Sequence, residues 1–521
     1  MSRAYPVMSL SDEFYFLPRS SGALRYLDCL DSLNRAKINE DISYLRDLLR
    51  NLEKLDTKTM GLETLIDHRL LALSIRGFLQ EFQQVKIWQH DPNLYLKIAC
   101  LGIEQIVNKL AMIKKEVHRE LSSRIRQIPR LLQEAKANLK AVEPAYRQAA
   151  AQTTATIIDY LKQHLPLFLK ARGRETEKLK TSVDKAIYAL EDFKLFLKRK
   201  VESENLIIDR AALEDLLVNS FSYKRNLKEI FEIACEEYQG ILKELKKTSA
   251  QLQTPKSWQG ILCGYKLKAK NHRDLLGLYS REISGLRDFL IRSRLVSIPG
   301  MQGVKVERTP PYLSALRASA SYSCSLTKRK RESALFYVGI DSITENIHQE
   351  YIFVSAHETY PGHHLLDSIR SNLKNPIRRQ IESPLFYEGW ASYAENLIGE
   401  FGYIKDARQR LVGLRRQAWR AIRAKLDAGI RINKLKAADA ANELCGLGYN
   451  PGRVKSMIGH YLLTYGYQLC YTIGKFEIER LRKRFVPRIG IRNFHDCLLG
   501  AGEIPFDLIE KRMEKLCGKN S

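Results

Sequence analysis

Apolar side chains recur every three to four positions through most of the first half of the chain. From Leu24 to about Ile291 they alternate with charged residues, as residues 45–55 and 131–142 show. This spacing places the apolar side chains on one face of a helix, and that face must pack against a neighbour. The pattern predicts stacked helical hairpins over residues 1–296.

A stretch rich in glycine and proline, residues 297–312, interrupts the helical pattern and predicts an internal boundary. Three segments with alternating or β-rich residues follow it: Ala318–Ser325, Ala334–Val338 and Tyr351–Ser355. These segments predict a small sheet, and the helical spacing returns from Pro384 to the end of the chain. We therefore expect a mostly α-helical protein with two halves, 1–296 and 297–521, of which the second contains the sheet.

Three of the eleven histidines stand in one octet, His-Glu-Thr-Tyr-Pro-Gly-His-His, at residues 357–364. Further along, Glu388 opens the segment Glu-Gly-Trp-Ala-Ser-Tyr-Ala-Glu, which ends at Glu395. Two imidazoles and a later carboxylate form the ligand set of many hydrolytic zinc sites, in which the fourth position is left for water. The octet and Glu388 together predict a metal site next to the sheet, in the second half of the chain.

The spacing of the octet departs from the His-Glu-x-x-His pattern, in which residues four apart share one face of a helix. Pro361 stands four residues after His357. On a regular helix His363 would lie on another face, and His364 would lie about two turns, or ~10 Å, along the axis. Because proline disrupts the preceding helical turn, we expect a bulged turn over residues 359–362. Such a bulge would bring His363 beside the first histidine, and His364 is the alternative ligand.

Two more carboxylates stand near the predicted ligands. Glu358 follows His357 directly, where a carboxylate can take a proton from a metal-bound water, whose pKa zinc lowers toward ~7. Glu395 lies seven residues after Glu388, on nearly the same helix face, and is placed to accept a hydrogen bond from a ligating imidazole. A plainer interpretation makes the histidines core residues, Glu388 a helix-capping acid and Glu395 a surface residue, but their joint occurrence favours the metal site.

Two strings resemble the bacterial "domain of unknown function 885" family, which is similar to gluzincin metallopeptidases: residues 357–365 and 387–395. The resemblance implies a gluzincin-like helical fold with a small sheet beside the metal-binding helix. It also implies that His357, His363 and Glu388 bind zinc and that Glu358 is the general base.

Residues 460–474 contribute several phenols that could stabilise an oxyanion. Tyr461 is our first choice for that role, and Tyr471 is a candidate for the substrate wall. Four residues here match the pattern of the resembled family: Tyr461, Gly466, Tyr471 and Gly474. Four positions depart from it: His460, Tyr465, Tyr467 and Gln468. The reaction class is therefore better indicated than the substrate.

Three arginines are candidates for holding a substrate carboxylate, which a guanidinium binds through two hydrogen bonds: Arg420, Arg423 and Arg431. Arg431 ends an Asp-Ala-Gly-Ile-Arg string where relatives in the resembled family carry Asp-Thr-Gly-Ile-His. The alternative is that each of the three is a surface charge.

The chain is strongly basic, with 85 lysines and arginines against 59 acidic residues and a formal charge of +26. The basic clusters are dispersed through several predicted helices and are accompanied by no nucleic-acid-binding motif. This dispersal favours a solvated basic surface over a nucleic-acid groove, with an anionic membrane surface as another alternative.

Nine cysteines are scattered along the chain without a Cys-x-x-Cys pair, which is typical of free thiols in a reducing compartment. The first residues show no charged-then-apolar signal pattern, and no run approaches the ~20 apolar residues of a membrane span. These features predict a cytoplasmic protein.

At 45% hydrophobic residues over 521 positions, the chain can bury the core of a sizeable enzyme. We expect a hydrolase with one zinc ion that cleaves peptide or other amide bonds, and Mn²⁺ or Co²⁺ would also suit the ligand types. The alternatives are an enzyme for a small-metabolite amide, and a basic-surface binding protein with a structural or vestigial metal site.

Overall fold

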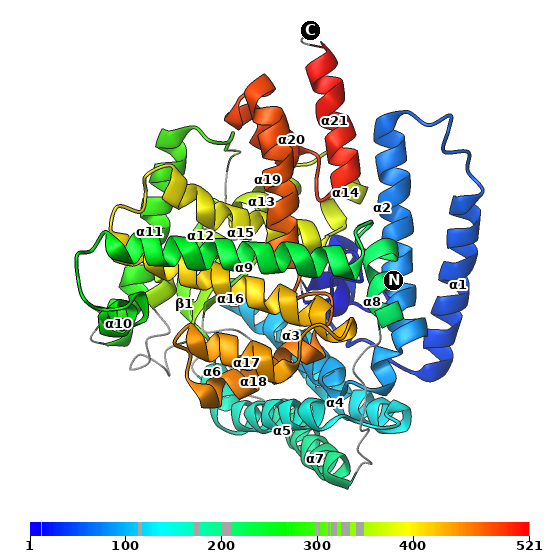
Figure 1. The fold of residues 1–521 in the computed structure, drawn as a ribbon. Coiled ribbons are helices and arrows are strands. Elements are labelled where there is room, and N and C mark those ends of the chain that lie inside the picture. Colours follow the sequence, from blue (N-terminus) through cyan, green and yellow to red (C-terminus); the bar gives the residue numbers. More distant parts are fainter. Residues whose placement is uncertain are drawn as a thin grey trace.

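Amphipathic helices form most of the protein, as expected (Figure 1). The computed structural model describes residues 1–11, 13–112, 117–170, 177–199, 210–267, 269, 271–298, 300, 303–310, 313, 320–324, 334–339 and 349–519. Many helices start at side chains that accept hydrogen bonds from first-turn N–H groups: Asn34, Asn226, Ser257, Asn271, Asp406 and Asn450. Such caps satisfy donors that have no partner inside the helix.

The helices of the first half are α1 (Arg35–Glu53), α2 (Leu62–Leu79), α3 (Pro92–Met112), α4 (Val117–Asn138), α5 (Pro144–Asp159), α6 (Leu165–Lys170), α7 (Glu177–Arg199), α8 (Arg210–Asn219), α9 (Leu227–Ala250), α10 (Trp258–Gly264) and α11 (His272–Ser293). Short 3-10 helices occur at Met8–Leu10, Ser21–Tyr26 and Ile87–Gln89, and π-helical turns at Gln80–Val85 and Tyr160–His164.

The second half contains strands β1 (Val304–Arg308), β2 (Ala320–Ser323) and β3 (Ala334–Val338). Its helices are α12 (Tyr351–Glu358), α13 (His363–Ser371), α14 (Pro376–Gln380), α15 (Pro384–Glu400), α16 (Ala407–Arg431), α17 (Ala437–Gly446), α18 (Pro451–Leu463), α19 (Cys470–Ile489), α20 (Ile491–Gly500) and α21 (Phe506–Lys519).

The sheet has the order β1-β3-β2, with β1 parallel and β2 antiparallel to β3. Strand β3 coincides with the predicted strand. Strand β2 lies inside the predicted segment 318–325, whose outer residues 318, 319 and 325 are outside the described residues. Strand β1 was not predicted, because its alternating Val-Lys-Val-Glu-Arg sequence lies within the breaker-rich stretch.

The predicted strand Tyr351–Ser355 is wrong, since these residues open helix α12. Its short β-rich run has too few residues for periodicity to distinguish a strand from a buried helix. The helix packs against α11 and α15, and Ile352, Phe353 and Ala356 are buried in the core. Tertiary packing therefore outweighs the local β propensity.

Two hydrophobic cores fill the molecule, and β3 joins them. Leu335 and Tyr337 belong to the core formed by the first helices, whereas Phe336 and Val338 belong to the core of the later helices. Successive side chains of a strand point to opposite faces, so one short, fully buried strand reaches both cores. Helix α2 also contributes to both cores.

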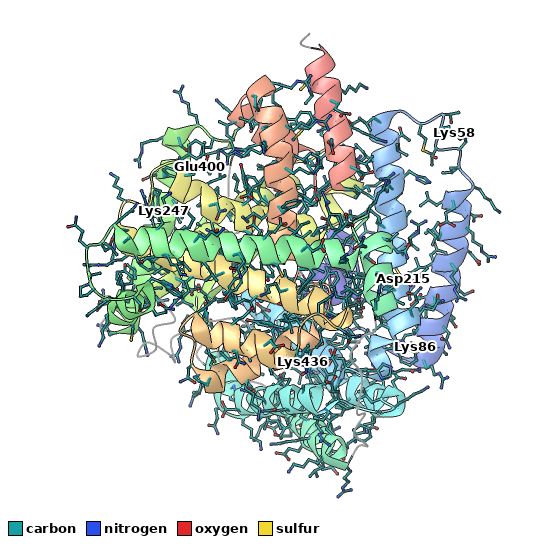
Figure 2. The ribbon with its side chains drawn as sticks, in the orientation of Figure 1. Lys58, Lys86, Asp215, Lys247, Glu400 and Lys436 are labelled. Atoms are coloured by element: carbon teal, nitrogen blue, oxygen red, sulfur yellow. The ribbon has the colours of Figure 1, made fainter. Side chains whose placement is uncertain are left out.

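Charged side chains lie on the outside of the molecule, both on helices and in the segments that connect them. Figure 2 labels six of these exposed residues: Lys58, Lys86, Asp215, Lys247, Glu400 and Lys436. Inside, α16 runs along α9, and α15 packs along α19. These two helix pairs carry most of the candidate site. Within the described part of the chain, none of the helices has the length and apolar character needed to cross a membrane.

Candidate metal centre

The histidine octet spans the end of one helix and the start of the next. Helix α12 ends at Glu358 and α13 begins at His363. The expected bulge within a continuous helix is therefore wrong, because the chain leaves the helix completely and turns through a cis Tyr360–Pro361 peptide bond. Proline and glycine residues in the turn separate the two helices, so the two histidines approach each other from different helices.

Gly362 allows this turn to be tight. A methyl group on its Cα would lie 1.8 Å from the carbonyl oxygen of His357 and 2.5 Å from that of Ala356. The Gly362 N–H donates to Ala356 O at 2.9 Å, and Trp390 Nε1–H donates to Pro361 O at 3.0 Å. Only glycine permits such a close backbone approach, so the Pro-Gly pair defines the turn.

The turn brings two imidazoles against the carboxylate of Glu388, in the second turn of α15. The Nε2 atoms of His357 and His363 lie 3.2 and 3.6 Å from Glu388 Oε2, and the ring centroids are 4.6 Å apart. One ligand atom from each of the three residues lies within 4.8 Å of the other two. All three side chains are buried, so the structure brings together the ligand set that the sequence predicts.

Two buried atoms of this cluster have no hydrogen-bond partner among the described residues. They are Glu388 Oε2 and His363 Nδ1. A buried acceptor without a donor is unfavourable unless another group satisfies it. Because Oε2 faces both imidazoles, a divalent cation bound by two nitrogens and one oxygen fits these residues.

His364 lies apart from the cluster. Its Nδ1 is 3.1 Å from the hydroxyl of Tyr322 on β2, and its ring centroid is 5.0 Å from that of Tyr360. The structure thus places His363, the favoured histidine, beside His357 and turns the alternative ligand toward the sheet.

Close packing of α15 on α19 holds Glu388 in position. A methyl group on Gly389 would lie 2.5 Å from Gly474 Cα, and one on Gly474 would lie 2.0 Å from the carbonyl oxygen of Leu385. The two backbones are therefore in direct contact at this pair of glycines. The contact also brings the start of α19 against the ligand cluster.

Two tyrosines that were not among the predicted site residues touch the candidate ligands. The hydroxyl of Tyr467 donates to Glu388 Oε1. The ring of Tyr387 stacks on that of His363, with centroids 3.8 Å apart and planes inclined by 10°. Tyr387 directly precedes the predicted ligand Glu388, and Tyr467 lies in the phenol-rich segment. Their closeness in the sequence to predicted site residues could therefore have identified them.

The two predicted tyrosines, Tyr461 and Tyr471, differ in whether they contact the candidate ligands. The Tyr471 ring stacks on His357, with centroids 6.2 Å apart. The hydroxyl of Tyr461 instead accepts a hydrogen bond from Trp419 Nε1 at 2.7 Å. The guanidinium of Arg423 lies between these groups, 4.1 Å from the Tyr471 ring and 5.0 Å from the Tyr461 ring. Tyr471 therefore borders the ligand cluster, and Tyr461 belongs to the layer around Arg423.

Glu395 lies against the first ligand, where the sequence predicted a partner for an imidazole. Its Oε1 is 3.0 Å from His357 Nδ1, and it also pairs with Arg420 at 2.7 Å and Arg416 at 3.0 Å. A carboxylate at Nδ1 favours the tautomer with the proton there, which leaves the Nε2 lone pair directed at the cluster. The alternative of a surface glutamate is wrong, because Glu395 is 2% exposed.

The three arginines predicted to hold a substrate carboxylate are all buried, so the alternative of surface charges is wrong: Arg420, Arg423 and Arg431. Arg423 Nε donates to Gln468 Oε1 at 2.6 Å, and Arg431 pairs with Asp427 at 2.8 Å. Of the three, Arg420 is the one in contact with a ligand, since its Nη2 lies 3.0 Å from the first imidazole.

The two glutamates of the site differ in electrostatics. Burial opposes ionisation of Glu388, but the two imidazoles of His357 and His363 beside it outweigh burial and hold the pKa of that carboxyl well below its usual range. For Glu358, burial dominates and raises the pKa to about 7. The Glu358 side chain is partly accessible, unlike the three ligands.

The helix-capping role considered for Glu388 is wrong, since this residue lies inside α15 and faces the imidazoles.

A sequence profile described as bacterial protein of unknown function (DUF885) matches residues 19–513. The chain belongs to this family. The match includes the helical first half as well as the two strings that carry the resemblance. A search of curated proteins found no match.

Two solved structures are similar to the chain over nearly its whole length. A "putative lipoprotein from Colwellia psychrerythraea" aligns with a TM-score of 0.77 at 15% identity, over 95% of this chain and 93% of that one. A "putative lipoprotein of unknown function from Shewanella oneidensis" aligns with a TM-score of 0.73 at 17% identity, over 94% of each chain. At such identities the likeness shows the fold alone.

Proposed function

We propose that this DUF885 protein is a zinc-dependent hydrolase of peptide or other amide bonds, with a gluzincin-like arrangement of His357, His363 and Glu388 as ligands. The observation that carries the proposal is the convergence of three ligand atoms within 4.8 Å of one another around an Oε2 that no described donor satisfies. Two imidazoles and one carboxylate leave a coordination position for water, as hydrolytic zinc sites do.

When bound, zinc would supply a water molecule of lowered pKa and polarise the carbonyl of the scissile bond. Glu358 is the proposed general base, because it adjoins the first ligand and is partly accessible while the ligands are buried. It would accept a proton from the attacking water and return it to the nitrogen that leaves, so that one water is consumed and an acid and an amine are formed.

Two phenols are candidates for the hydrogen bond that stabilises the oxyanion. Tyr461 is the residue chosen from the sequence. Tyr467 is favoured by the contacts, because its hydroxyl already lies at Glu388 whereas that of Tyr461 accepts from Trp419. Replacing each tyrosine by phenylalanine distinguishes the two candidates. The variant that has lost the oxyanion donor should show a kcat lowered by ~10²–10³-fold.

The test combines metal analysis with digestion of a peptide library. The wild-type protein is expected to bind about one zinc per chain and to cleave peptides. Glu358→Gln should keep the metal and lose ~10²–10⁴-fold in rate, the usual contribution of a general base. The matched control is Glu400→Gln, on the exposed end of α15, which should change neither property. If the wild-type protein binds metal but cleaves no peptide, and Glu358→Gln behaves in the same way as the wild type, the hydrolase proposal is contradicted. The protein would then be a metal-binding protein.

A further inference from the structure

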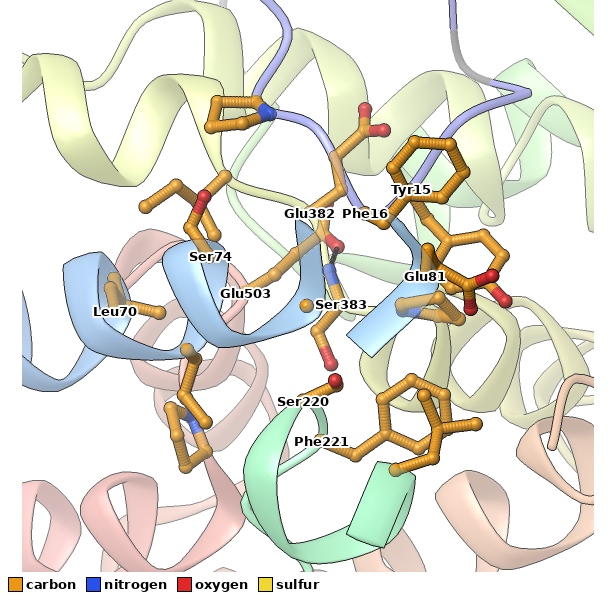
Figure 3. Close-up of a pocket in the computed structure, with 17 residues that line it drawn as sticks. Tyr15, Phe16, Leu70, Ser74, Glu81, Ser220, Phe221, Glu382, Ser383 and Glu503 are labelled. Carbon is orange, nitrogen blue, oxygen red and sulfur yellow. Dashed lines mark hydrogen bonds between the residues drawn. The ribbon is translucent and has the colours of Figure 1, made fainter. Parts of the chain in front are cut away.

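A cavity lies beside the candidate metal centre, where the segment around Tyr15, helix α2, the end of α8 and the start of α15 meet (Figure 3). The cavity volume is about 30 Å³. A single water needs roughly 10–15 Å³, so the cavity has room for two or three small groups. Its wall is mostly apolar but includes three glutamates.

Two of these glutamates already have cationic partners. Glu382 pairs with Arg19 at 2.8 Å and with Arg370 at 2.6 Å. Glu503 pairs with Arg370 at 3.1 Å and accepts a hydrogen bond from Ser383 N at 2.8 Å, drawn in Figure 3. These carboxyls are therefore part of the protein's own ion-pair network.

The third glutamate, Glu81, has no basic partner among the described residues. It is 2% exposed and its Oε1 accepts a hydrogen bond from Tyr465 at 3.1 Å. No described donor bonds its Oε2. In the same wall, the buried hydroxyl of Ser220 has no hydrogen-bond partner among the described residues. The Glu81 carboxyl and the Ser220 hydroxyl thus border one cavity from different segments.

Two residues of the cavity wall, Pro384 and Tyr15, are near neighbours of the candidate metal centre. Pro384 lines it from the first turn of α15, and Glu388 follows one turn later on nearly the same face, ~6 Å along the axis. The Tyr15 ring lines it as well and lies 6.1 Å from the ring of Tyr467, whose hydroxyl bonds Glu388. A substrate held at the metal centre would therefore have this cavity next to it.

We propose that the cavity receives a short side chain that ends in an ammonium group, carried by the substrate residue next to the bond that is cut, with Glu81 as its carboxylate partner. This inference rests on the proposed hydrolase function. An ammonium supplies up to three donors and a positive charge, and the Glu81 carboxyl and the Ser220 hydroxyl can accept its hydrogen bonds. The apolar wall suits the methylene groups that carry it.

The raised pKa of the Glu81 carboxyl is consistent with a buried carboxyl group that has no cation beside it among the described residues. Burial raises the pKa of this carboxyl to about 7, while the hydrogen bond from Tyr465 opposes the rise. A bound ammonium would favour the ionised form, as opposite charges in a buried setting do.

The test measures peptide binding to the zinc-loaded Glu358→Gln protein, so that turnover is not required. Three acylated peptides differ at one residue only: 2,4-diaminobutyrate, its uncharged analogue norvaline, and glycine. We expect the diaminobutyrate peptide to bind about tenfold or more tightly than the norvaline peptide, as a buried charge-assisted hydrogen bond does. Adding Glu81→Gln should reduce this ratio to near one and leave the affinity for the norvaline peptide unchanged.

A second variant tests the cavity without changing its charge. A methyl group on Gly77 would point at Ser220 Oγ, 3.7 Å away, and at Phe16 Cα, 3.9 Å away. Gly77→Val should therefore fill the space and weaken both side-chain peptides, with no change for the glycine peptide. The control is Asp31→Asn, a buried carboxyl bonded by Val7 N and outside the cavity, which should keep the binding ratio.

The outcomes separate this inference from the hydrolase proposal. Loss of cleavage in every assay with an intact ammonium preference would contradict the hydrolase alone. Absence of any preference in the parent, a preference that survives Glu81→Gln, or no binding of any of the peptides overturns the cavity assignment. Zinc content and the thermal midpoint of unfolding confirm that each variant is folded.

Discussion

Helix α13 carries two buried polar clusters, one at each end, that differ in what their charges face. At its start His363 joins His357 against Glu388. Toward its end Arg370 pairs with Asp367, Glu382 and Glu503, at 2.7, 2.6 and 3.1 Å. In the second cluster, the arginine therefore forms ion pairs with acidic side chains.

The first cluster is different because its carboxylate faces two imidazoles, which are neutral when unprotonated, and forms no ion pair with a lysine or arginine in the described part of the chain. A buried ion pair is a structural element that needs no ligand, and breaking it leaves an uncompensated charge. A carboxylate that faces neutral nitrogens can bind a cation together with them, as we propose here. The comparison thus separates a structural network from a candidate binding site a few residues away on the same helix.

The largest expected effect is the loss of a metal ligand. His363→Ala should abolish stoichiometric zinc binding and hydrolysis, because three protein ligands are needed to hold the ion with one position open. His364→Ala is the matched control, since this side chain bonds Tyr322 outside the cluster. Zinc analysis after dialysis and the rate of peptide cleavage measure both. If His364 is essential for zinc binding and His363 is not, His364 is the second ligand and the assignment of His363 is wrong.

Breaking the ion-pair cluster should affect stability and not metal binding. Arg370→Met leaves buried carboxylates without their cation, which costs about 3–5 kcal/mol of unfolding free energy. Arg482→Gln, which removes an exposed pair with Glu400, should cost at most ~1 kcal/mol. Urea unfolding and zinc content are the measurements. Loss of zinc in a folded Arg370→Met protein would mean that the two clusters are not separate.

A pH series sharpens the comparison for Glu81, a carboxyl that pairs with neither a basic side chain nor an imidazole among the residues that the structure describes. Its folded pKa of about 7 lies above the ordinary value of ~4.3, so the folded state binds the proton more tightly. The resulting stability is complete below the unfolded pKa and is lost as the pH rises through 7. Glu81→Gln cannot ionise, so relative to wild type it should gain up to ~3 kcal/mol between pH 4 and pH 8. Urea unfolding at both pH values tests this, and an unchanged difference would contradict the raised pKa.

The smallest expected effect concerns the contact that positions Glu388. Gly474→Ala would place a methyl group 2.0 Å from a backbone oxygen of α15, so the helices must separate, which costs about 1–3 kcal/mol. Gly399→Ala, also in α15, meets nothing within 4 Å and should be neutral or stabilising. Thermal unfolding compares the two. We also expect a weaker zinc affinity in Gly474→Ala only, and equal affinities would show that this contact does not position the ligand.

The sequence predicted the ligand cluster better than the local structure that forms it. His357, His363 and Glu388 were identified from residue types and spacing, and the structure brings them together. The bulged helix was wrong because Gly362 lets the backbone turn back on itself, a contact that periodicity does not reveal. The strand expected at 351–355 was wrong because burial between two helices decides the structure of a short apolar run.

Partners of charged groups were harder to predict than the groups themselves. Arg420, Arg423 and Arg431 were recognised as candidates, but Arg420 and Arg423 pair with residues distant in the chain, Glu395 and Gln468. Arg431 instead pairs with Asp427 of the same helix. Tyr467 reaches Glu388 because α15 and α19 touch through two glycines. No local pattern contains that contact.

By itself the sequence determined the helical class, the strand β3, the family and the three residues that converge as candidate ligands. These features depend on periodicity, on residue chemistry and on short strings, all of which are local. Only the tertiary structure decided that His364 turns toward β2, that α12 is a helix, and that Glu81 borders a cavity beside the cluster. These features depend on long-range packing, in which side chains far apart in the chain compete for the same buried space.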